Sequence, residues 1–392
     1  MRFTIGSVVG ALVGISLGVL GIWALGQHQA LAPKALEHRA LLPEADGALG
    51  HVLLHWTPKA DRDLARPYAD FLSAIDPSVQ VTFVIPRNMS EPEREKFERR
   101  LSAIDPSNRL LVRAERVEAD GPITAWSKDR ALVSRQDSVT GRAHLIVPAE
   151  PPDIWKERHN DWRTVSEVVK RFPDRYELDA SPFDFDAGDI AVGRGGLLFD
   201  TNLLEKNRRR GYLNMQQLAG RLGEYFHMQV VPLGQLWGDT PRHHLSMYMT
   251  PLTMNRVLVG DPKAAAAIVG DDFQPGEVAS DTQAPLVADF SQQTVARFER
   301  AEQQLVSQGF EVTRIVNVPF DDKTYLSYTN GVFEVRDGRH IAYVPSYDIP
   351  TLDDAAHETY RRLGWVVVPI HVRTLFPYHG TIGCVVNVLA RK

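Results

Sequence analysis

The chain has 392 residues, of which 44% are hydrophobic and 24% are charged, and its formal net charge is −5. This composition is that of a globular protein with enough length for a large core. Because Lys and Arg are not in excess, the composition argues against binding to nucleic acid. The single cysteine, Cys384, cannot form an internal disulfide, and the chain has no cysteine pattern for a structural zinc site.

Residues 1–26 are expected to form a transmembrane anchor or a signal segment. The run from Phe3 to Leu25 has no charged side chain, and about 20 apolar residues let a helix cross a bilayer. Arg2 precedes this run and favours a cytoplasmic N-terminus. The expected location is therefore the inner (cell) membrane, with one span and an extracytoplasmic body; the alternative is a cleaved signal and a secreted or periplasmic protein. The run has a glycine at every fourth position, which allows a homodimer through this helix.

Residues 27–50 are expected to form a linker or stalk, and residues 51–392 a single catalytic domain. In that domain, apolar runs bounded by Gly, Pro or Asp alternate with amphipathic segments, which predicts an α/β fold. The expected strands are His51–Trp56, Val79–Ile85, Arg109–Arg113, Ala131–Ser134, His144–Val147, Ile190–Phe199, Gln229–Leu233, Leu245–Met249, Arg256–Val259, Glu311–Val316, Gly331–Val335, His340–Pro345, Trp365–Ile370 and Cys384–Leu389. The expected helices are Asp61–Ile75, Glu91–Ile104, Trp162–Arg171, Tyr212–Tyr225, Ser291–Gln308 and Asp353–Leu363.

The only glycine-rich stretch of the domain, Gly193–Gly196, divides one of these runs. It is not followed directly by a helix, so it does not match a dinucleotide-binding loop, and it predicts a hairpin turn.

Four short stretches place acidic, imidazole or thiol side chains at junctions between loops and expected strands. They are Ala125–Arg130, Phe183–Asp189, Arg242–Met247 and Gly380–Cys384. Loops that are held by a rigid scaffold often carry reactive side chains. These stretches are therefore the candidates for a functional site.

In this order, the stretches resemble the motifs of the guanidine-modifying enzymes, or pentein superfamily. That superfamily includes agmatine, arginine and peptidylarginine deiminases, dimethylarginine hydrolases and amidinotransferases. A Trp-x-x-Asp element comes first, followed by an acidic-x-Gly-Asp element, a His element and a C-terminal Gly-x-x-x-Cys element. The segment Tyr325–Tyr347 is also similar to the penultimate module of agmatine deiminases. The resemblance implies a pentein fold, a five-bladed α/β propeller of ββαβ modules around the active site.

The resemblance also implies a catalytic role for three residues. Cys384 would be the nucleophile, and His244 would be the general acid and base. Asp186 would hold and polarise His244, in a place that is usually taken by Glu. A guanidinium carbon is a poor electrophile, so it needs a thiolate, which a nearby imidazolium and the bound cation stabilise.

Four further residues would bind the substrate. Asp129 would pair with the guanidinium, and Trp126 would stack on this planar cation. Ser246 stands where deiminases usually have an Asp that also holds the guanidinium, although dimethylarginine hydrolases are similar in lacking that Asp. Asn330 completes this set. Many members have His directly before the Cys, where this chain has Gly383.

The expected activity is hydrolysis of a guanidino group through a covalent thiouronium intermediate, with arginine, agmatine, peptidyl-arginine or a related compound as substrate. No cofactor and no metal are expected. The first alternative is an amidinotransferase, which differs in the acceptor of the amidino group. The second is a catalytically inactive, membrane-anchored pentein that binds a ligand, which Ser246 and Gly383 favour.

Structural interpretations of the same residues stay open at this point. Asp129 could be a surface acid screened by Lys128 and Arg130, and Cys384 could be a buried, inert thiol. Asn330 could be a turn residue. A calcium loop that includes Asp184, Asp186 and Asp189 is a minor alternative. A metal shared by His243 and His244 is another, although neighbouring residues on a strand point to opposite faces.

Overall fold

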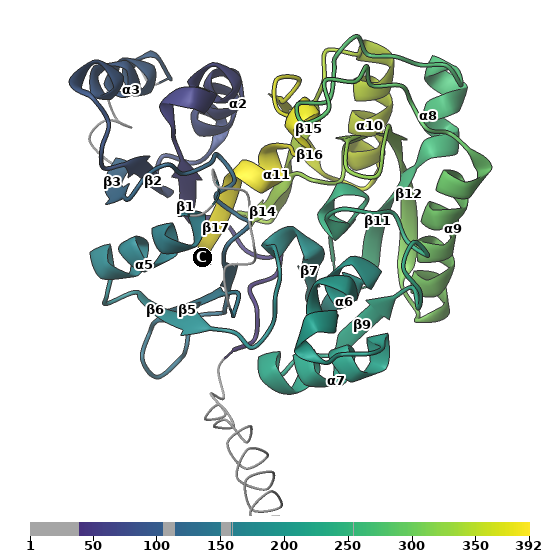
Figure 1. Ribbon diagram of the computed structural model, residues 1–392, viewed down its shortest axis with the longest axis horizontal. Coiled ribbons are helices and arrows are strands. Elements are labelled where there is room, and N and C mark those ends of the chain that lie inside the picture. Colours follow the sequence, from purple (N-terminus) through teal and green to yellow (C-terminus); the bar gives the residue numbers. More distant parts are fainter. Residues whose placement is uncertain (1–38, 105–113, 150–157, 159, 254) are drawn as a thin grey trace, which may run out of the picture. The chain divides into compact units, whose positions relative to one another are not determined.

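The structure, a computed structural model, describes residues 39–104, 114–149, 158, 160–253 and 255–392 (Figure 1). Within these ranges, no helix is long and apolar enough to cross a lipid bilayer. The expected anchor or signal segment, 1–26, lies outside the described residues.

Among the described residues, the strands form five sheets with a repeated pattern, and Figure 1 shows their arrangement. In each sheet, two antiparallel strands are followed by a helical crossover to a parallel strand. The strands, in spatial order, are β17 (Val386–Arg391), β1 (Leu49–His55), β2 (Gln80–Pro86) and β3 (Ala114–Ala119); β4 (Leu132–Val133), β5 (Ala143–Val147) and β6 (Tyr176–Ala180); β7 (Ile190–Gly193), β8 (Gly196–Asp200) and β9 (Val230–Leu233); β10 (Met249–Pro251), β11 (Arg256–Asp261), β12 (Glu311–Pro319) and β13 (Tyr325–Ser327); and β14 (Val332–Arg336), β15 (Arg339–Ser346) and β16 (Val366–His371). This is the fivefold ββαβ repeat of the expected pentein fold.

The first sheet joins the two ends of the described chain. Its last strand, β17, pairs antiparallel with β1, so that Leu54 lies opposite Val386. Strand β1 then pairs in parallel with β2, and β2 with β3. One module is therefore built from both ends of the sequence, which brings the C-terminal motif next to elements near residue 50.

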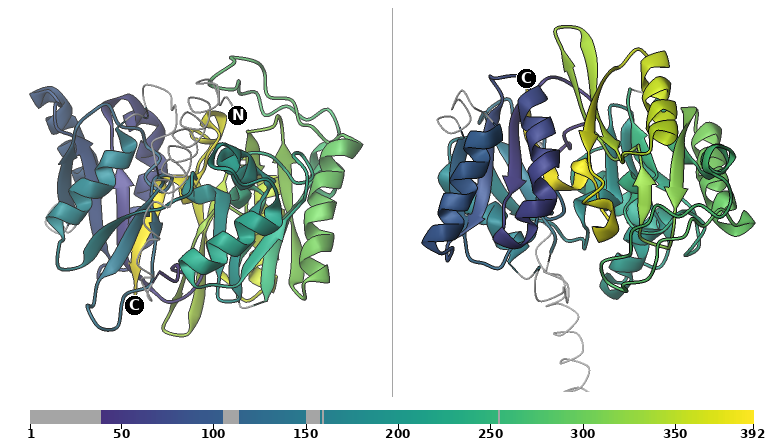
Figure 2. Two further views of the ribbon diagram at one scale, coloured as in Figure 1. Left: turned by 60° about the horizontal axis from the view of Figure 1, so that its bottom comes forward. Right: turned by 90° about the horizontal axis from the view of Figure 1, so that it is seen from above.

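The helices are α2 (Asp61–Ala74), α3 (Glu91–Ile104), α5 (Asp161–Arg171), α6 (Thr201–Asn207), α7 (Met215–Phe226), α8 (Pro262–Val269), α9 (Gln292–Ser307), α10 (Pro350–Arg362) and the short α11 (Ile382–Val385). Apart from α11, which precedes β17, the helices connect strands within the modules, and α2, α3, α5, α7, α8 and α9 lie at the periphery of the view in Figure 1; Figure 2 gives two further views. Short 3₁₀ turns are η1 (Pro58–Ala60), η3 (Ala187–Asp189), η4 (Arg208–Arg210), η5 (Leu245–Met247) and η6 (Phe376–Tyr378).

Part of the expected linker belongs to the folded body. Leu41 is 1% exposed and forms a β-bridge with Ser134. Glu44 pairs with Lys128 at 3.0 Å, and Ala45 is buried in the core. Residues 39–50 therefore belong to the folded body, and their backbone also bonds to Val133 and Val192.

Several expected elements differ from the structure. Cys384 was expected to begin a strand but lies in α11, and β17 starts two residues later. The expected strand Leu245–Met249 is the turn η5 followed by the start of β10. The expected strand Arg109–Arg113 lies outside the described residues, and β3 follows at Ala114. Sequence patterns also missed β6, whose polar residues are partly exposed, as is usual for an edge strand.

Candidate active site

Five of the residues identified in the sequence occupy the same position in five modules. Each lies two to five residues before the first strand of a module: Asp129 before β4, Asp186 before β7, His244 before β10, Asn330 before β14 and Cys384 before β17. Because the modules repeat one topology, these positions lie at equivalent strand ends. The repeat explains why residues that are far apart in the sequence meet.

Hydrogen bonds connect the loops that carry these residues, neighbour to neighbour. The Lys128 amide donates to the Cys384 carbonyl at 3.2 Å, the Ala187 amide to the Asp129 carbonyl at 2.8 Å, the Gly383 amide to the Asn330 carbonyl at 3.2 Å, and the Thr329 hydroxyl to the Ser246 carbonyl at 3.0 Å. Between the remaining two loops, Gly188 packs against His244 so closely that a Cβ on Gly188 would lie 2.6 Å from Nδ1. The loops therefore support one another's positions.

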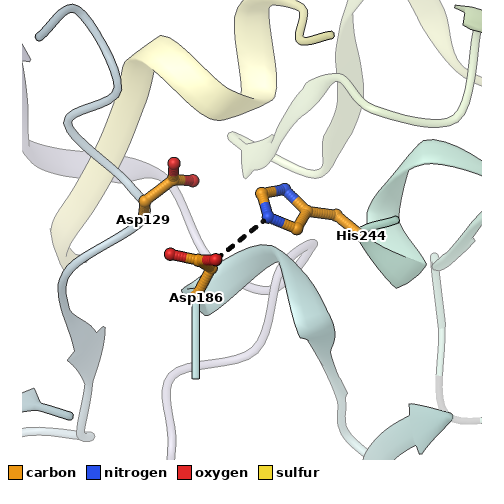
Figure 3. Close-up of side chains that lie close together, drawn as sticks. All are labelled: Asp129, Asp186 and His244. Atoms are coloured by element: carbon orange, nitrogen blue, oxygen red, sulfur yellow. Dashed lines mark ion pairs between the residues drawn. The ribbon is translucent and has the colours of Figure 1, made fainter. Parts of the chain in front are cut away.

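Asp186 and His244 form an acid–imidazole pair (Figure 3). His244 Nε2 lies 3.6 Å from Asp186 Oδ2. Asp186 caps η3, and its side chain and that of Asp189 form a reciprocal capping box, which fixes the carboxylate. The other imidazole nitrogen, Nδ1, has no hydrogen-bond partner among the described residues. Nε2 of the pair thus faces the carboxylate, and Nδ1 is a buried nitrogen beside Gly188.

The surroundings keep His244 protonated and Asp186 ionised. Burial by itself would lower the pKa of His244, but Asp186, then Cys384, Asp129 and Asp189, raise it to about 10. Burial would raise the pKa of Asp186, but the neighbouring cations and the hydrogen bond from His244 hold it well below its usual range. At neutral pH the pair is therefore an imidazolium and a carboxylate.

This pKa makes stability depend on pH. The folded state holds the His244 proton more tightly than the unfolded state, whose pKa is near 6.5. Its stabilising contribution is therefore complete below pH 6.5 and is lost as the pH rises towards about 10. Urea denaturation should show that the wild-type free energy of unfolding falls by up to about 1.4 kcal/mol per pH unit in this window, relative to His244→Gln.

The matched control for this prediction is His243→Gln. Burial, and then the neighbouring His244, lower the pKa of His243 well below its usual value, so this imidazole is neutral above pH 6.5 in both states. The His243 variant should therefore keep the wild-type slope. Parallel stability profiles for wild type and His244→Gln would contradict the assignment.

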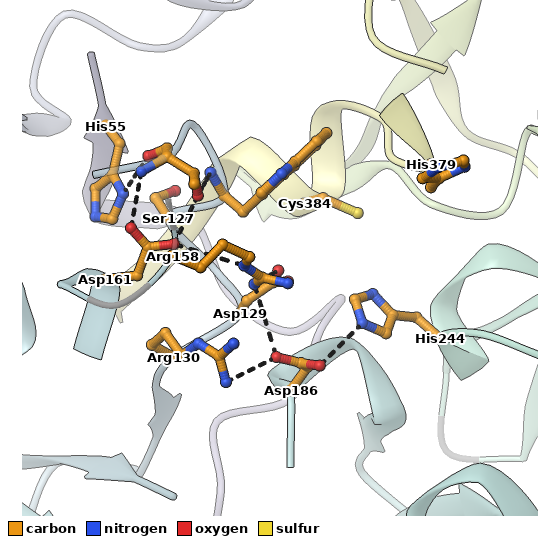
Figure 4. Close-up of polar contacts among 12 residues, drawn as sticks. His55, Ser127, Asp129, Arg130, Arg158, Asp161, Asp186, His244, His379 and Cys384 are labelled. Atoms are coloured by element: carbon orange, nitrogen blue, oxygen red, sulfur yellow. Dashed lines mark hydrogen bonds and ion pairs between the residues drawn. The ribbon is translucent and has the colours of Figure 1, made fainter. Parts of the chain in front are cut away.

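Cys384 is 4% exposed and lies in α11, with its sulfur facing the His244 ring (Figure 4). The buried Asn330 amide donates to Sγ at 3.0 Å and also lies 2.9 Å from the Met247 sulfur and 3.4 Å from the Ser246 hydroxyl. A Cβ on Gly383 would lie 1.9 Å from the Asn330 amide oxygen, so glycine is required beside the cysteine. Asn330 thus touches the thiol, and Ser246 lies next to Asn330.

The site faces a cavity of about 730 Å³. Its walls include Trp126, Asp129, Asp186, His244 and Cys384. Trp126 is half-buried, and its ring packs against the backbone of Gly380, where a Cβ would lie 2.4 Å from the ring. The cavity has the size of a small-molecule site, and four modules contribute to its walls.

The sequence did not predict the ion pairs that Arg130, Arg158 and Lys206 form at this site; Figure 4 shows the first two. Arg158 forms a close ion pair with Asp129 and lies 3.7 Å from Asp186. Lys206 Nζ lies 2.8 Å from Asp186 Oδ2, and Arg130 Nη1 lies 3.0 Å from Asp186 Oδ1. The sequence left open whether Lys128 or Arg130 screens Asp129 or binds a substrate carboxylate. In the structure, Lys128 pairs with Glu44 and Arg130 with Asp186.

The carboxylates Asp129 and Asp186 also lie with His244 in an arrangement that could suggest a metal site. One ligand atom from each lies within 4.8 Å of the others. However, both carboxylates already face protein cations, and a protonated imidazole cannot bind a metal. Asp184, the third acid of the expected calcium alternative, instead pairs with Arg209 and Arg210. The geometry favours an ion-paired site over a metal site.

The two neighbouring histidines do not point to opposite faces. Their rings stack with centroids 4.1 Å apart and an interplanar angle of 13°. The reason is that they precede η5 and are not on a strand, and that His243 has a positive φ of 74°. His243 Nε2 hydrogen-bonds to the His379 carbonyl oxygen at 3.0 Å, which leaves the contact with Asp186 to His244.

Comparison with known proteins identifies the fold. No protein-family model matches the sequence, and no curated protein matches it either. Among solved structures, an agmatine deiminase of Enterococcus faecalis matches with a TM-score of 0.62 at 15% identity, over 91% of this chain and 97% of that one. The chain has the fold of the agmatine deiminases. A substrate-bound agmatine deiminase variant from C. jejuni matches with a TM-score of 0.63 at 16% identity, over 89% of this chain and 95% of that one. The resemblance to penteins is thus confirmed at the level of the fold.

Proposed function

We propose that this protein hydrolyses the guanidino group of a small molecule or arginine derivative, with Cys384 as the nucleophile. One observation carries the proposal: Cys384, His244, Asp186 and Asp129, which come from four modules, meet at one cavity. The agmatine deiminase fold supports the guanidino class of substrate. Trp126, in the wall of the same cavity, offers a face for a planar cation.

In the first half of the proposed reaction, the Cys384 thiolate attacks the guanidinium carbon and forms a C–S bond. The tetrahedral adduct collapses as one C–N bond breaks, and the leaving nitrogen departs as an amine. His244 gives its proton to that nitrogen, since its raised pKa keeps it protonated at neutral pH. The remaining group is a thiouronium on the cysteine sulfur, and Asn330 holds that sulfur in place.

In the second half, water attacks the thiouronium carbon. His244 has lost its proton and can now take one from the water, while Asp186 stabilises the imidazolium that forms again. The C–S bond breaks, the thiolate returns, and a ureido product leaves as the hydroxyl proton passes to solvent, from which the released amine takes up a proton. The balance is one guanidinium and one water in, and one ureido compound and one ammonium or alkylammonium out.

A product assay tests the proposal directly. The full chain should convert at least one member of a panel of guanidino compounds (arginine, agmatine, methylated and peptidyl arginines) into a ureido product and an amine. The Cys384→Ala variant should produce neither. Turnover that survives this substitution would end the cysteine mechanism, and transfer of the amidino group to an added amine would identify an amidinotransferase.

A second candidate function is a pentein that binds a ligand without turnover. Arg158 favours it, because its guanidinium already pairs with the carboxylate that is proposed to receive the substrate. The charges of Asp129, Asp186 and Asp189 are balanced by those of Arg130, Arg158 and Lys206. Ligand binding to the wild type without ureido product over the whole panel would support this function.

A further inference from the structure

A second cavity lies beside the candidate active site. Its volume is about 440 Å³, and it shares three wall residues with the active-site cavity: Thr124, Trp126 and Tyr378. The two cavities therefore adjoin at these three residues, one on the side of Cys384 and the other on the side of Ile123 and Leu375. Both volumes lie in the range of ligand-binding cavities.

The walls of the second cavity are mainly apolar. They include Pro58, Ala60, Met89, Ile123, Ala125 and Leu375. Ile123 and Leu375 are almost fully buried, so that part of the wall is a packed surface. The cavity also has three charged residues: Glu93 accepts hydrogen bonds from Ser90, Asp63 interacts with the Tyr378 hydroxyl, and Lys59 is exposed.

The active-site cavity differs sharply in chemistry. It is lined by ionised groups such as Asp129, Asp186, Arg158 and Lys206. One end of the combined space is therefore suited to a charged planar group, and the other to an apolar one. Burying a second charge of the ligand among apolar walls would cost free energy unless that charge is paired.

We infer that the second cavity binds an apolar alkyl or aryl substituent of the substrate, so that the preferred substrate is a guanidine with an apolar tail. This inference rests on the proposed function, because it places the guanidino group at Cys384. Agmatine carries a second positive charge in place of this tail, and the wall of the cavity includes the cation Lys59. It should therefore be a poorer ligand than an apolar guanidine of the same length.

The test measures binding of n-alkylguanidines, from methyl to octyl, and of agmatine to the full chain with Cys384→Ala. Each methylene that enters the cavity should tighten binding about fourfold, until the cavity is filled. Calorimetry gives the dissociation constants without any need for turnover. Phenylbutylguanidine tests whether an aryl group is accepted as well as an alkyl group.

A variant within the second cavity provides the specific control. Ala60 is half-buried at the end of η1, and Ala60→Phe should fill the space, so that the gain with chain length disappears while methylguanidine binds as before. Ala266→Phe is the matched substitution, because Ala266 is half-buried in the wall of a separate cavity beside α8. It should leave the gain intact. Melting temperatures show whether either variant is folded.

The outcomes separate this inference from the proposed function. Equal affinities along the series, an unchanged gain in Ala60→Phe, or tighter binding of agmatine than of butylguanidine would overturn the inference alone. A gain that Ala60→Phe abolishes, with no hydrolysis of any guanidine by the wild type, would support the binding cavity and contradict the hydrolase. Absence of binding by every guanidine would overturn both.

Discussion

His244→Gln is expected to lower kcat for a guanidino substrate by about 10²- to 10⁴-fold, the usual contribution of a general acid and base. Glutamine keeps a polar side chain of similar reach but cannot carry a proton to the leaving nitrogen or take one from water. The imidazole that it replaces is the one paired with Asp186 and facing Cys384. Steady-state kinetics on the best substrate of the panel measure the change.

The neighbouring imidazole is again the control. His243 stacks on His244, but its Nε2 is occupied by the His379 carbonyl and its pKa is lowered. His243→Gln should therefore reduce kcat by far less than His244→Gln, through a small change in the position of the His244 ring. Equal losses in the two variants would mean that the proton-transfer role is assigned to the wrong nitrogen base.

The position of each site residue next to a strand could be predicted from the sequence, because strands are recognised from local patterns. Asp129, Asp186, His244, Asn330 and Cys384 each stand just before an apolar strand, and strand starts are recognisable from composition. The order of these residues resembles that of the penteins, and this resemblance implied a fold with the active site at the centre of the modules. The roles of these residues in substrate binding and catalysis remain predictions.

The ion pairs of the site could not be anticipated in the same way. Arg158 lies in a polar stretch that resembles any surface loop, and its long side chain reaches Asp129 only because the fold brings the start of α5 next to the loop before β4, where Thr124 bonds to Asp161. Lys206 lies on α6, a helix of seven residues that is too short for a clear periodic pattern. Asp200, which is the last residue of β8 and the N-cap of α6, was the one local signal that could have located this helix.

Hydrogen-bond partners also depend on contacts between distant segments, which local sequence patterns do not reveal. Asn330 was expected to contact substrate, but the structure shows its amide on the Cys384 sulfur. Gly383 was regarded as a loss relative to enzymes with His before Cys. The Asn330 amide oxygen fills the space where a side chain at 383 would begin, so Gly383 and Asn330 form one packing arrangement. Gly383 therefore gives no independent argument for an inactive protein.

Arg158→Gln is expected to lower the free energy of unfolding by about 3–5 kcal/mol, the usual cost of removing one partner from a buried ion pair. The side chains of Arg158 and Asp129 are only 17% and 5% exposed, so water cannot readily replace the missing charge. Urea denaturation measures the loss. Arg171→Gln is the matched control, because Arg171 pairs with Glu115 at the surface, where an ion pair contributes at most about 1 kcal/mol.

The same variant tests what Asp129 binds. With Arg158 gone, the Asp129 carboxylate is open to an external guanidinium, and a small ligand such as methylguanidine fits this position without an internal competitor. At 100 times its dissociation constant, the ligand should restore about 2.7 kcal/mol to Arg158→Gln. It should bind the wild type more weakly, because it must displace the Arg158 side chain. Equal stabilisation of Arg158→Gln and Arg171→Gln by the ligand would show that Asp129 is a structural partner of Arg158 and does not receive a substrate guanidinium.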